Sequence, residues 1–152
     1  MRAVIQRVSE ASVSTGGVTN GITGKGLVVL LGVEKGDTTA DAEALASKIV
    51  RLRIFSDGDG KMNLSLSDVG GGLLVISNFT LIADYSHGNR PSYFGAEEPE
   101  AAERLYDYFC IVLRDLGYHV ETGVFGADMQ VKISNDGPVT IVMDSALLKK
   151  KK

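Results

Sequence analysis

Hydroxyl and amide side chains interrupt one strongly apolar run of the chain, and they are the first groups that could do chemistry. Ser77, Asn78 and Thr80 stand within a run that extends from Leu73 to Leu81. Burying such groups without a hydrogen-bond partner costs free energy, so they must pair or line a site. The run predicts either a strand whose polar groups bind a ligand or an edge strand with one solvated face.

A strand that continues through Leu81 would alternate its side chains between two faces. Ser77, Phe79 and Leu81 would share one face. Asn78 and Thr80 would share the other. The hydroxyl of Thr80 or Ser77 could act as a nucleophile, but no activating base stands beside Thr80 in the sequence.

The segment from Asn135 to Thr140 is the second candidate, because it combines turn residues with a glycine-proline pair. Asn, Asp, Gly and Pro follow one another up to Pro138, which is typical of a turn between two strands. The bond between Gly137 and Pro138 can also adopt the cis form, which is a specified feature where it occurs. An ordinary turn and a part of a binding site both remain open at this point.

The histidines and the cysteine predict neither a metal site nor a catalytic triad. The only histidines are His87 and His119, and they lack the spacing that metal ligands share. His87 lies in the polar loop 85–92, a place where contact with a ligand is common, but we expect its side chain to be exposed to solvent. Cys110 borders the apolar stripe of a predicted helix and is expected to be a half-buried structural residue. We therefore expect no metal and no cofactor.

The composition predicts a soluble, cytoplasmic protein that binds nucleic acid only locally. The 152 residues carry 16 basic and 19 acidic side chains, and the closing Lys149–Lys152 supplies four of the basic ones. The rest of the chain is therefore more acidic than the net charge of −3 suggests. Sequence-blind binding of nucleic acid rests on many phosphate contacts, so any RNA contact should be small. One cysteine, no signal-like N-terminus and no membrane-length apolar run fit the cytoplasm.

Hydrophobic periodicity and capping residues predict two helices and several short strands. One helix is capped by Asp37 or Thr38 and continues through Arg51. The other begins at Pro99 and ends at Gly117. In chain order, the expected strands are 3–8, 11–14, 27–33, 53–56, 73–81, 129–133 and 139–143.

These elements predict a single α+β domain over residues 1–148 and a solvated lysine tail at 149–152. Strands and helices do not alternate regularly, so we expect a barrel-like or two-sheet β core with two main helices. The buried stripe of the second helix is expected at Leu105, Phe109, Val112, Leu113 and Leu116.

Together these segments resemble the D-aminoacyl-tRNA deacylase family over nearly the whole chain. The family's two most specific signatures, SQFTL and NxGPVT, are found here as Ser77–Leu81 and Asn135–Thr140. Asn78 replaces the usual Gln and is one methylene shorter, so its amide has a reduced reach. Further family-like blocks occur at Ile5–Val8, Ala11–Val13, Gly26–Leu27, Leu31–Val33, Arg53–Asp57, Gly60–Asn63, Arg90–Ser92 and Ala127–Val131.

The resemblance implies an α+β deacylase fold and a homodimer whose active sites lie at the subunit interface. In such proteins the strand Ser77–Thr80 of one subunit forms the catalytic floor of the pocket. Gly137 and Pro138 of the other subunit, joined by a cis bond, project into that pocket. Their carbonyl groups would collide with an L side chain but admit D-amino acids and glycine. D-aminoacyl-tRNA and glycyl-tRNA are therefore the expected substrates.

The implied reaction is hydrolysis of the ester between the amino acid and the 3′-terminal ribose of tRNA. The ribose 2′-hydroxyl would help to activate water, and backbone N–H groups around Phe79 and Thr80 would hold the developing charge. By similarity, Phe125 and Met129 would pack near the terminal adenine. The full set of implied substrate-binding residues is Arg7, Arg90, Phe125, Met129, Val139 and Thr140.

Three alternatives remain open. A general esterase would use Thr80 or Ser77 as its nucleophile and would not need tRNA. A dimer that binds the tRNA end without catalysis would result if Asn78 abolished activity. A relative with relaxed chirality would hold the Gly137–Pro138 bond trans and admit small L-amino acids.

Overall fold

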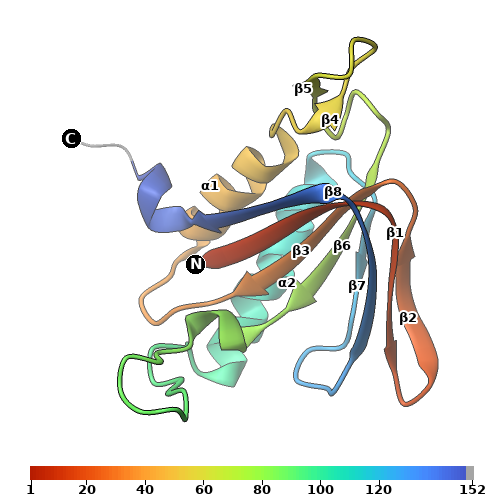
Figure 1. Cartoon of the computed structure of the whole chain (residues 1–152). Coiled ribbons are helices and arrows are strands. Elements are labelled where there is room, and N and C mark those ends of the chain that lie inside the picture. Colours follow the sequence, from red (N-terminus) through yellow and green to blue (C-terminus); the bar gives the residue numbers. More distant parts are fainter. Residues whose placement is uncertain (150–152) are drawn as a thin grey trace.

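Six strands form one mixed sheet around the long strand β1 in the computed structural model, which describes residues 1–149 (Figure 1). The strand order is β2-β1-β3-β6-β7, and β8 pairs with β1 outside this path. A second sheet of two short strands pairs β4 with β5. The strands are β1 (Arg2–Thr15), β2 (Val18–Thr23), β3 (Gly26–Gly32), β4 (Phe55–Ser56), β5 (Met62–Leu64), β6 (Gly72–Ser77), β7 (Val120–Thr122) and β8 (Gln130–Asp144).

Strand β1 has three partners because two of them share one of its edges. Its first half, through Val8, pairs with β3, and its second half, from Ala11, pairs with β2. Strand β8 follows the other edge along almost its whole length. The sequence predicted two strands here, which is wrong, because pairing with β8 continues past the register shifts around Val8 and Glu10.

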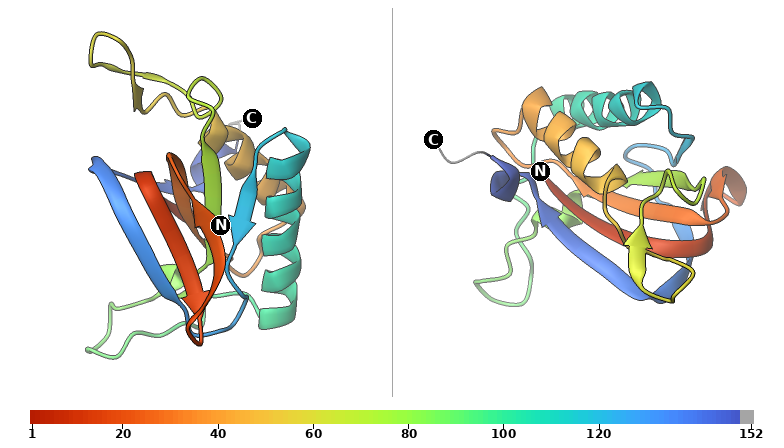
Figure 2. Two further views of the ribbon diagram at one scale, coloured as in Figure 1. Left: turned by 90° about the vertical axis from the view of Figure 1, so that its right-hand side faces the viewer. Right: turned by 90° about the horizontal axis from the view of Figure 1, so that it is seen from above.

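The two main helices lie on one face of the sheet (Figure 2). Helix α1 (Thr39–Val50) is capped by Thr38, one of the two caps that the sequence predicted, and Asp41 completes a capping box with it. Helix α2 (Pro99–Asp115) begins at its proline and packs against α1. Its buried stripe includes Tyr106 and Cys110, whereas Leu116, expected in that stripe, is 50% exposed. The helix has already ended at Asp115, so Leu116 no longer faces the sheet.

Apolar side chains fill two regions, one on each face of the sheet. The larger core lies between the sheet and the helices and contains Phe55, Phe109 and Leu113. The smaller cluster contains Val8, Ala11, Val13, Val28, Leu74 and Ile76, with Leu30, Met129, Val131 and Ile133 only partly buried against it. The single α+β domain with a barrel-like sheet is therefore confirmed, and its second face is incompletely covered by the described chain.

Strand β6 is shorter than the sequence predicted. Its last pair is Ser77 with Leu31 of β3, and β3 ends at the next residue, so no partner remains for a longer strand. After Asn78 the chain turns into a short 3₁₀ helix, η1 (Phe79–Ile82). The predicted alternation of faces from Ser77 to Leu81 is therefore wrong, because the residues after Asn78 are helical.

The predicted turn between the last two strands is a bulge within one strand. Val8 of β1 pairs with Asn135 of β8, and Gln6 pairs with Thr140, so residues 136–139 oppose Arg7 alone. Strand β8 thus continues through a segment that was expected to end it. The peptide bond between Gly137 and Pro138 within this bulge is cis.

The end of the described chain is the short 3₁₀ helix η2 (Ser145–Leu148), followed by Lys149. The Nζ atom of Lys149 lies 3.6 Å from Oδ1 of the buried Asp41. The rest of the predicted lysine tail, 150–152, lies outside the described residues. In the part of the chain that the structure describes, no helix has the length and hydrophobicity to span a membrane.

Candidate functional site

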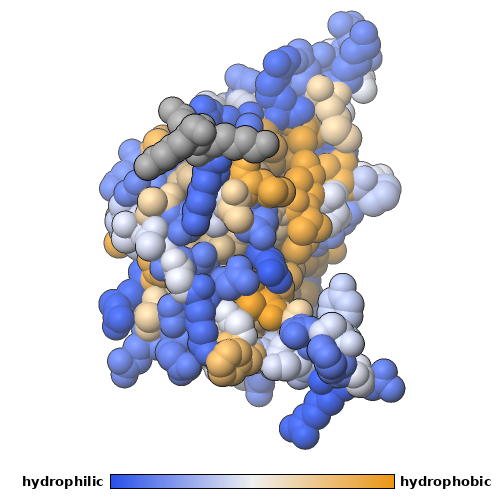
Figure 3. Space-filling model, turned by 90° about the vertical axis from the view of Figure 1, so that its left-hand side faces the viewer, coloured by the Kyte–Doolittle hydropathy of each residue, from blue (hydrophilic) through white to orange (hydrophobic). Residues whose placement is uncertain are grey.

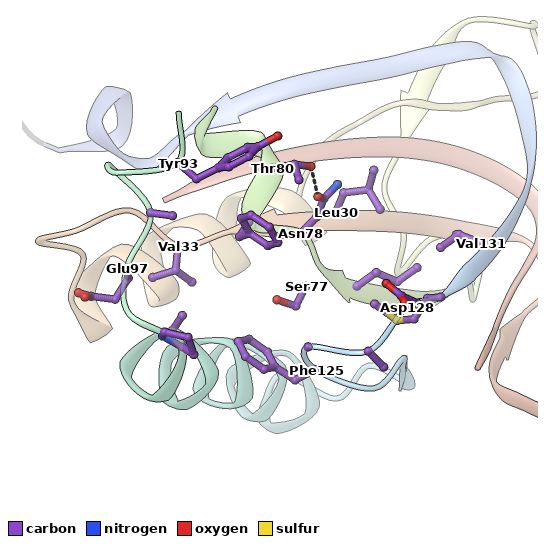
Figure 4. A pocket seen from close by; sticks show the side chains of 18 of the residues that line it. Leu30, Val33, Ser77, Asn78, Thr80, Tyr93, Glu97, Phe125, Asp128 and Val131 are labelled. Atoms are coloured by element: carbon purple, nitrogen blue, oxygen red, sulfur yellow. Dashed lines mark hydrogen bonds between the residues drawn. The ribbon is translucent and has the colours of Figure 1, made fainter. Parts of the chain in front are cut away.

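A pocket of about 840 Å³ opens where β6 ends (Figure 4). Helix η1 and the end of β6 form its floor, the start of α2 forms one wall, and the chain between β7 and β8 forms another. Its lining residues are Leu30, Val33, Ile76, Ser77, Asn78, Phe79, Thr80, Tyr93, Ala96, Glu97, Glu98, Pro99, Ala102, Phe125, Gly126, Ala127, Asp128, Met129, Val131 and Ile133.

The floor of this pocket exposes backbone donors. The N–H of Asn78 still donates to the carbonyl of Leu31, at 2.8 Å, as the last bond of the β6 ladder. The N–H groups of Phe79 and Thr80 come at the start of η1, where a helix offers no internal acceptor. Phe79 is 58% exposed, and no hydrogen bond from either N–H group is found among the described residues.

The hydroxyl of Thr80 is bonded to an amide and not to a base. It donates to Oδ1 of Asn78 at 2.5 Å. The carboxylates that line the pocket are Glu97, Glu98 and Asp128, and among the described residues none of them bonds to Thr80. In Figure 4, Glu97 and Asp128 lie at opposite ends of the pocket. A Thr80 nucleophile therefore has no activating partner in this arrangement.

Phe125 lies on the wall opposite Tyr93 (Figure 4), and a buried tyrosine supports this wall. The ring of Phe125 lies 6.0 Å from that of Tyr106, centroid to centroid. Tyr106 donates its hydroxyl to the carbonyl of Val75 in β6 at 2.7 Å, and burial raises the pKa of this phenol. The structure thus brings Phe125 and Met129 to the same pocket as the Ser77–Thr80 stretch.

Two further aromatic rings meet at the mouth of the pocket. Phe79 and Tyr93 pack edge to face, with centroids 5.0 Å apart and planes at 77°. Tyr93 belongs to a segment whose backbone is bonded to the neighbouring elements. Ser92 exchanges two hydrogen bonds of 2.8 Å with Asp84, and the N–H of Lys35 donates to Gly95 at 2.9 Å.

The bulge on β8 is a separate region, outside the pocket of its own chain. Gly137 and Pro138 are exposed and do not line the pocket. Arg7 holds the backbone of the bulge, since its Nε donates to the carbonyl of Asp136 at 2.8 Å, and its Nη1 is itself held by the carbonyl of Ile54 at 2.8 Å. The Arg7 side chain is only 11% exposed.

An amide closes the base of the same bulge. Nδ2 of Asn135 donates to the carbonyl of Arg7 at 2.9 Å and to that of Val139 at 3.1 Å. Val139 is buried, and the hydroxyl of Thr140 accepts from Gln6 at 3.1 Å. Of the residues expected to contact substrate, Arg7, Val139 and Thr140 therefore lie with the bulge and not with the pocket.

The remaining candidates lie away from the pocket. Arg90 and His87 occupy the exposed loop between Asp84 and Ser92. Cys110 is buried in α2, and burial raises the pKa of its thiol to about 11, so the expectation of a structural cysteine is confirmed. Within residues 1–149, no group of three or more His, Cys, Asp or Glu side chains could hold a metal ion.

Comparison with known proteins identifies the family. A model of the family described as D-Tyr-tRNA(Tyr) deacylase matches residues 4–144. A protein of Dehalococcoides mccartyi named D-aminoacyl-tRNA deacylase is 60% identical over 145 residues, which cover 95% of each chain. Another with the same name, from Anaeromyxobacter dehalogenans, is 55% identical over 148 residues and covers 97% of this chain and 99% of its own.

This chain belongs to the D-Tyr-tRNA(Tyr) deacylase family.

Solved structures agree with this deacylase fold. The structure titled "c-Myc DNA Unwinding Element Binding Protein" is similar with a TM-score of 0.90 and 42% identity, covering 95% of this chain and 98% of its own. A probable eukaryotic D-amino acid tRNA deacylase is similar with a TM-score of 0.77 and covers 93% and 97% of the two chains. At 16% identity this second likeness supports the fold alone.

Sequence reasoning missed several residues that line this pocket. Tyr93, Glu97 and Ala102 come from the approach to α2 and from its first turns, and Leu30 comes from β3. The residue types at these positions are ordinary for a hydrophobic core or a surface loop, so the sequence around them gives no sign of a binding site. The aromatic pair Tyr93–Phe94 after a polar stretch was the one available signal.

Proposed function

We propose that this protein hydrolyses the ester that joins a D-amino acid to the 3′-terminal ribose of a tRNA. The observation that carries this proposal is the pocket, which gathers Ser77–Thr80, Phe125 and Met129 from distant parts of the chain. Relatives that are 55 to 60% identical over nearly their full length are named for this activity.

The floor of the pocket suits an ester that needs little activation. Water adds to the ester carbonyl carbon, and the oxygen of the resulting tetrahedral intermediate carries a negative charge. The N–H groups of Phe79 and Thr80 are free to stabilise that charge. The ribose 2′-hydroxyl relays the proton: as it accepts a proton from the water, it passes its own proton to the 3′ oxygen. The bond between the carbonyl carbon and the 3′ oxygen then breaks, and that oxygen leaves as the 3′-hydroxyl. Asn78 orients the reactants through the amide that Thr80 holds.

Selection against L-amino acids is assigned to the bulge of a second subunit. Gly137 and Pro138 are exposed, lie outside the pocket of their own chain and are held by Arg7 and Asn135. Carbonyl groups presented on such a fixed backbone would collide with an L side chain at the α-carbon. A D side chain would point away, and glycine would fit, so glycyl-tRNA is a second substrate of the same site.

An apolar row across the open face of the sheet supports the homodimer. Ile76, Leu30, Val4 and Val142 are neighbours in successive strands, from β6 through β3 and β1 to β8. Ile76 and Leu30 line the pocket, and Val142 at the other end is 76% exposed. Figure 3, seen from the side of the two termini, shows hydrophobic side chains gathered in a band with hydrophilic borders. A second copy on this face would bring one bulge near the other pocket.

The tRNA contact is assigned to the terminal nucleoside. Phe125 and Met129 offer an apolar wall to the adenine, for which stacking contributes about 1–3 kcal/mol per base. Arg90, on its exposed loop, is available to a phosphate or ribose. Binding only the end of the tRNA requires few phosphate contacts, so an acidic protein can bind it. The substrate is found in the cytoplasm.

The deciding experiment is deacylation of D-Tyr-tRNA and L-Tyr-tRNA by the purified protein, with a D-tyrosine ester that lacks tRNA as control. Rapid loss of the D-charged tRNA alone supports the proposal and its chiral selection. Equal cleavage of the simple ester would favour a general esterase with a Ser77 or Thr80 nucleophile. Binding of charged tRNA without deacylation would favour a non-catalytic tRNA-end-binding dimer.

A further inference from the structure

Three exposed aromatic rings and one lysine form a strip beside the pocket mouth. Phe79 and Tyr93 belong to both the strip and the pocket lining, and Phe94 extends it outward with 82% of its surface exposed. The Nζ atom of Lys35 lies 3.7 Å from the centre of the Phe94 ring. We refer to Lys35, Phe79, Tyr93 and Phe94 as the aromatic strip.

The strip is held in place although its rings are exposed. Residues 92–97 are bonded at both ends, by the pair between Asp84 and Ser92 and by the N–H of Glu97, which donates to Val33 at 3.0 Å. Lys35 itself donates its N–H to Gly95 within the same stretch. Because the backbone that carries these rings is already anchored, ordering the rings on ligand binding costs less free energy than it would on a loose loop.

Charge changes sign from the pocket to the strip. The charged residues that line the pocket are the carboxylates Glu97, Glu98 and Asp128. They disfavour a phosphate inside the pocket, whereas the ammonium group of Lys35 lies outside it on the strip. A nucleoside without a 3′ phosphate can occupy the pocket, and the phosphates on its 5′ side are best placed outside.

We propose that the aromatic strip binds the unpaired nucleotides that precede the terminal nucleoside of the tRNA. The inference rests on the proposed function and extends it from one nucleoside to a short single strand. If the terminal nucleoside occupies the pocket, the strand must leave across the rim that Phe79 and Tyr93 form. Aromatic faces with a nearby cation are the surface that single-stranded nucleic acid binds without strict sequence preference.

The test compares two substrates with Phe94→Ala and Lys35→Gln. One substrate is full-length D-Tyr-tRNA, and the other is D-tyrosyl-adenosine, which lacks every preceding nucleotide. Phe94→Ala should raise KM about tenfold for the tRNA, as expected for one lost stacking contact, and leave KM for D-tyrosyl-adenosine unchanged. Lys35→Gln should raise KM for the tRNA about threefold and reduce its salt dependence by about one phosphate contact.

Two exposed residues of the β4–β5 hairpin provide matched controls. Met62→Ala and Lys61→Gln remove a similar apolar surface and the same charge where no pocket residue lies. Both controls should leave both substrates unaffected. An equal rise in KM for tRNA and D-tyrosyl-adenosine would overturn the proposal, because the strip would then act on the aminoacyl-adenosine itself. No change for either substrate would also overturn it.

Direct binding separates failure of the strip from failure of the proposed function. A fluorescent oligonucleotide ending in CCA should bind the wild-type protein, and Phe94→Ala should weaken this binding about tenfold. If the wild type cleaves neither substrate but shows this difference, the proposed function fails and the strip stands. If the wild type cleaves D-Tyr-tRNA and Phe94→Ala binds the oligonucleotide as tightly as the wild type does, the proposal for the aromatic strip is wrong and the proposed function stands.

Discussion

The floor of the pocket and the bulge on β8 differ in the hydrogen bonding of their backbone groups. At the floor, β6 loses its partner after Ser77, and the N–H groups of Phe79 and Thr80 are left without acceptors in η1. At the bulge, Arg7 and Asn135 hold the backbone with three hydrogen bonds between 2.8 and 3.1 Å. Free donors suit a charge that appears only during reaction, whereas fixed carbonyls suit a steric test made before it.

The bulge should therefore be the less tolerant region, and Gly137→Ala should break it most severely. A Cβ atom at this position would lie 2.1 Å from the backbone nitrogen of Val139, so the backbone must move. We expect D-Tyr-tRNA deacylation to fall about 100-fold, as is typical when a positioning group shifts by about 1 Å.

Gly58→Ala is the matched control, because a Cβ atom there would meet nothing within 4 Å. Thermal unfolding should separate loss of function from loss of fold. Wild-type kinetics and selectivity in Gly137→Ala would contradict the role of the bulge.

Substitution of Arg7, which holds the bulge, should have a smaller and more specific effect than substitution of Gly137 within it. Arg7→Ala deletes the bonds to Asp136 and Ile54, and we expect the D/L selectivity to fall about tenfold, which equals about 1.4 kcal/mol of discrimination. The free energy of unfolding should fall by about 2 kcal/mol, because a largely buried charged donor is lost. Paired assays with D- and L-Tyr-tRNA measure the first effect and urea unfolding the second.

Arg7→Lys keeps the charge but cannot donate to two carbonyls in the same geometry, so its selectivity should lie between those of the wild type and Arg7→Ala. Equal loss of activity toward D- and L-substrates in Arg7→Ala would mean that Arg7 stabilises the fold without controlling chirality.

The pocket floor should tolerate the loss of a side chain, because backbone groups are assigned the chemistry. Thr80→Ala removes the hydrogen bond to Asn78, worth about 1 kcal/mol, and should lower kcat about fivefold. Single-turnover deacylation of D-Tyr-tRNA measures this change. Complete loss of activity in a folded variant that still binds substrate would restore the Thr80 nucleophile.

The smallest effect is expected for Asn78→Gln, which adds one methylene to a half-buried amide at the same floor. The family's usual residue should be accepted, so kcat/KM should change by no more than about twofold, as for changes of about 0.5 kcal/mol. A large decrease would show that this pocket has been rebuilt around the shorter side chain.

The sequence predicted elements well where one local pattern decides them. Helix α1 follows from the cap at Thr38 and its apolar spacing, and α2 follows from Pro99. The two signatures were recognised through the resemblance, and the structure places Ser77–Thr80 with Phe125 in one pocket.

The errors fall where a distant strand decides the outcome. The end of β6 at Ser77 depends on where β3 stops, and the residues 136–139 form a bulge because β1 pairs with both of their flanks. Neither fact is encoded near the residues concerned. Tyr93 reaches the pocket only because its segment is bonded to Lys35 and Asp84, which are remote from each other in the chain.

The bulge also affects how readily the sheet can aggregate through its open edge. Strand β8 pairs with β1 on one side, and among the described residues its other edge has no strand partner. A long open edge is a template for sheet extension and aggregation. Residues 136–139 interrupt that edge, and Pro138 has no N–H to offer an incoming strand. The segment assigned to substrate selection therefore also protects the sheet against uncontrolled polymerisation.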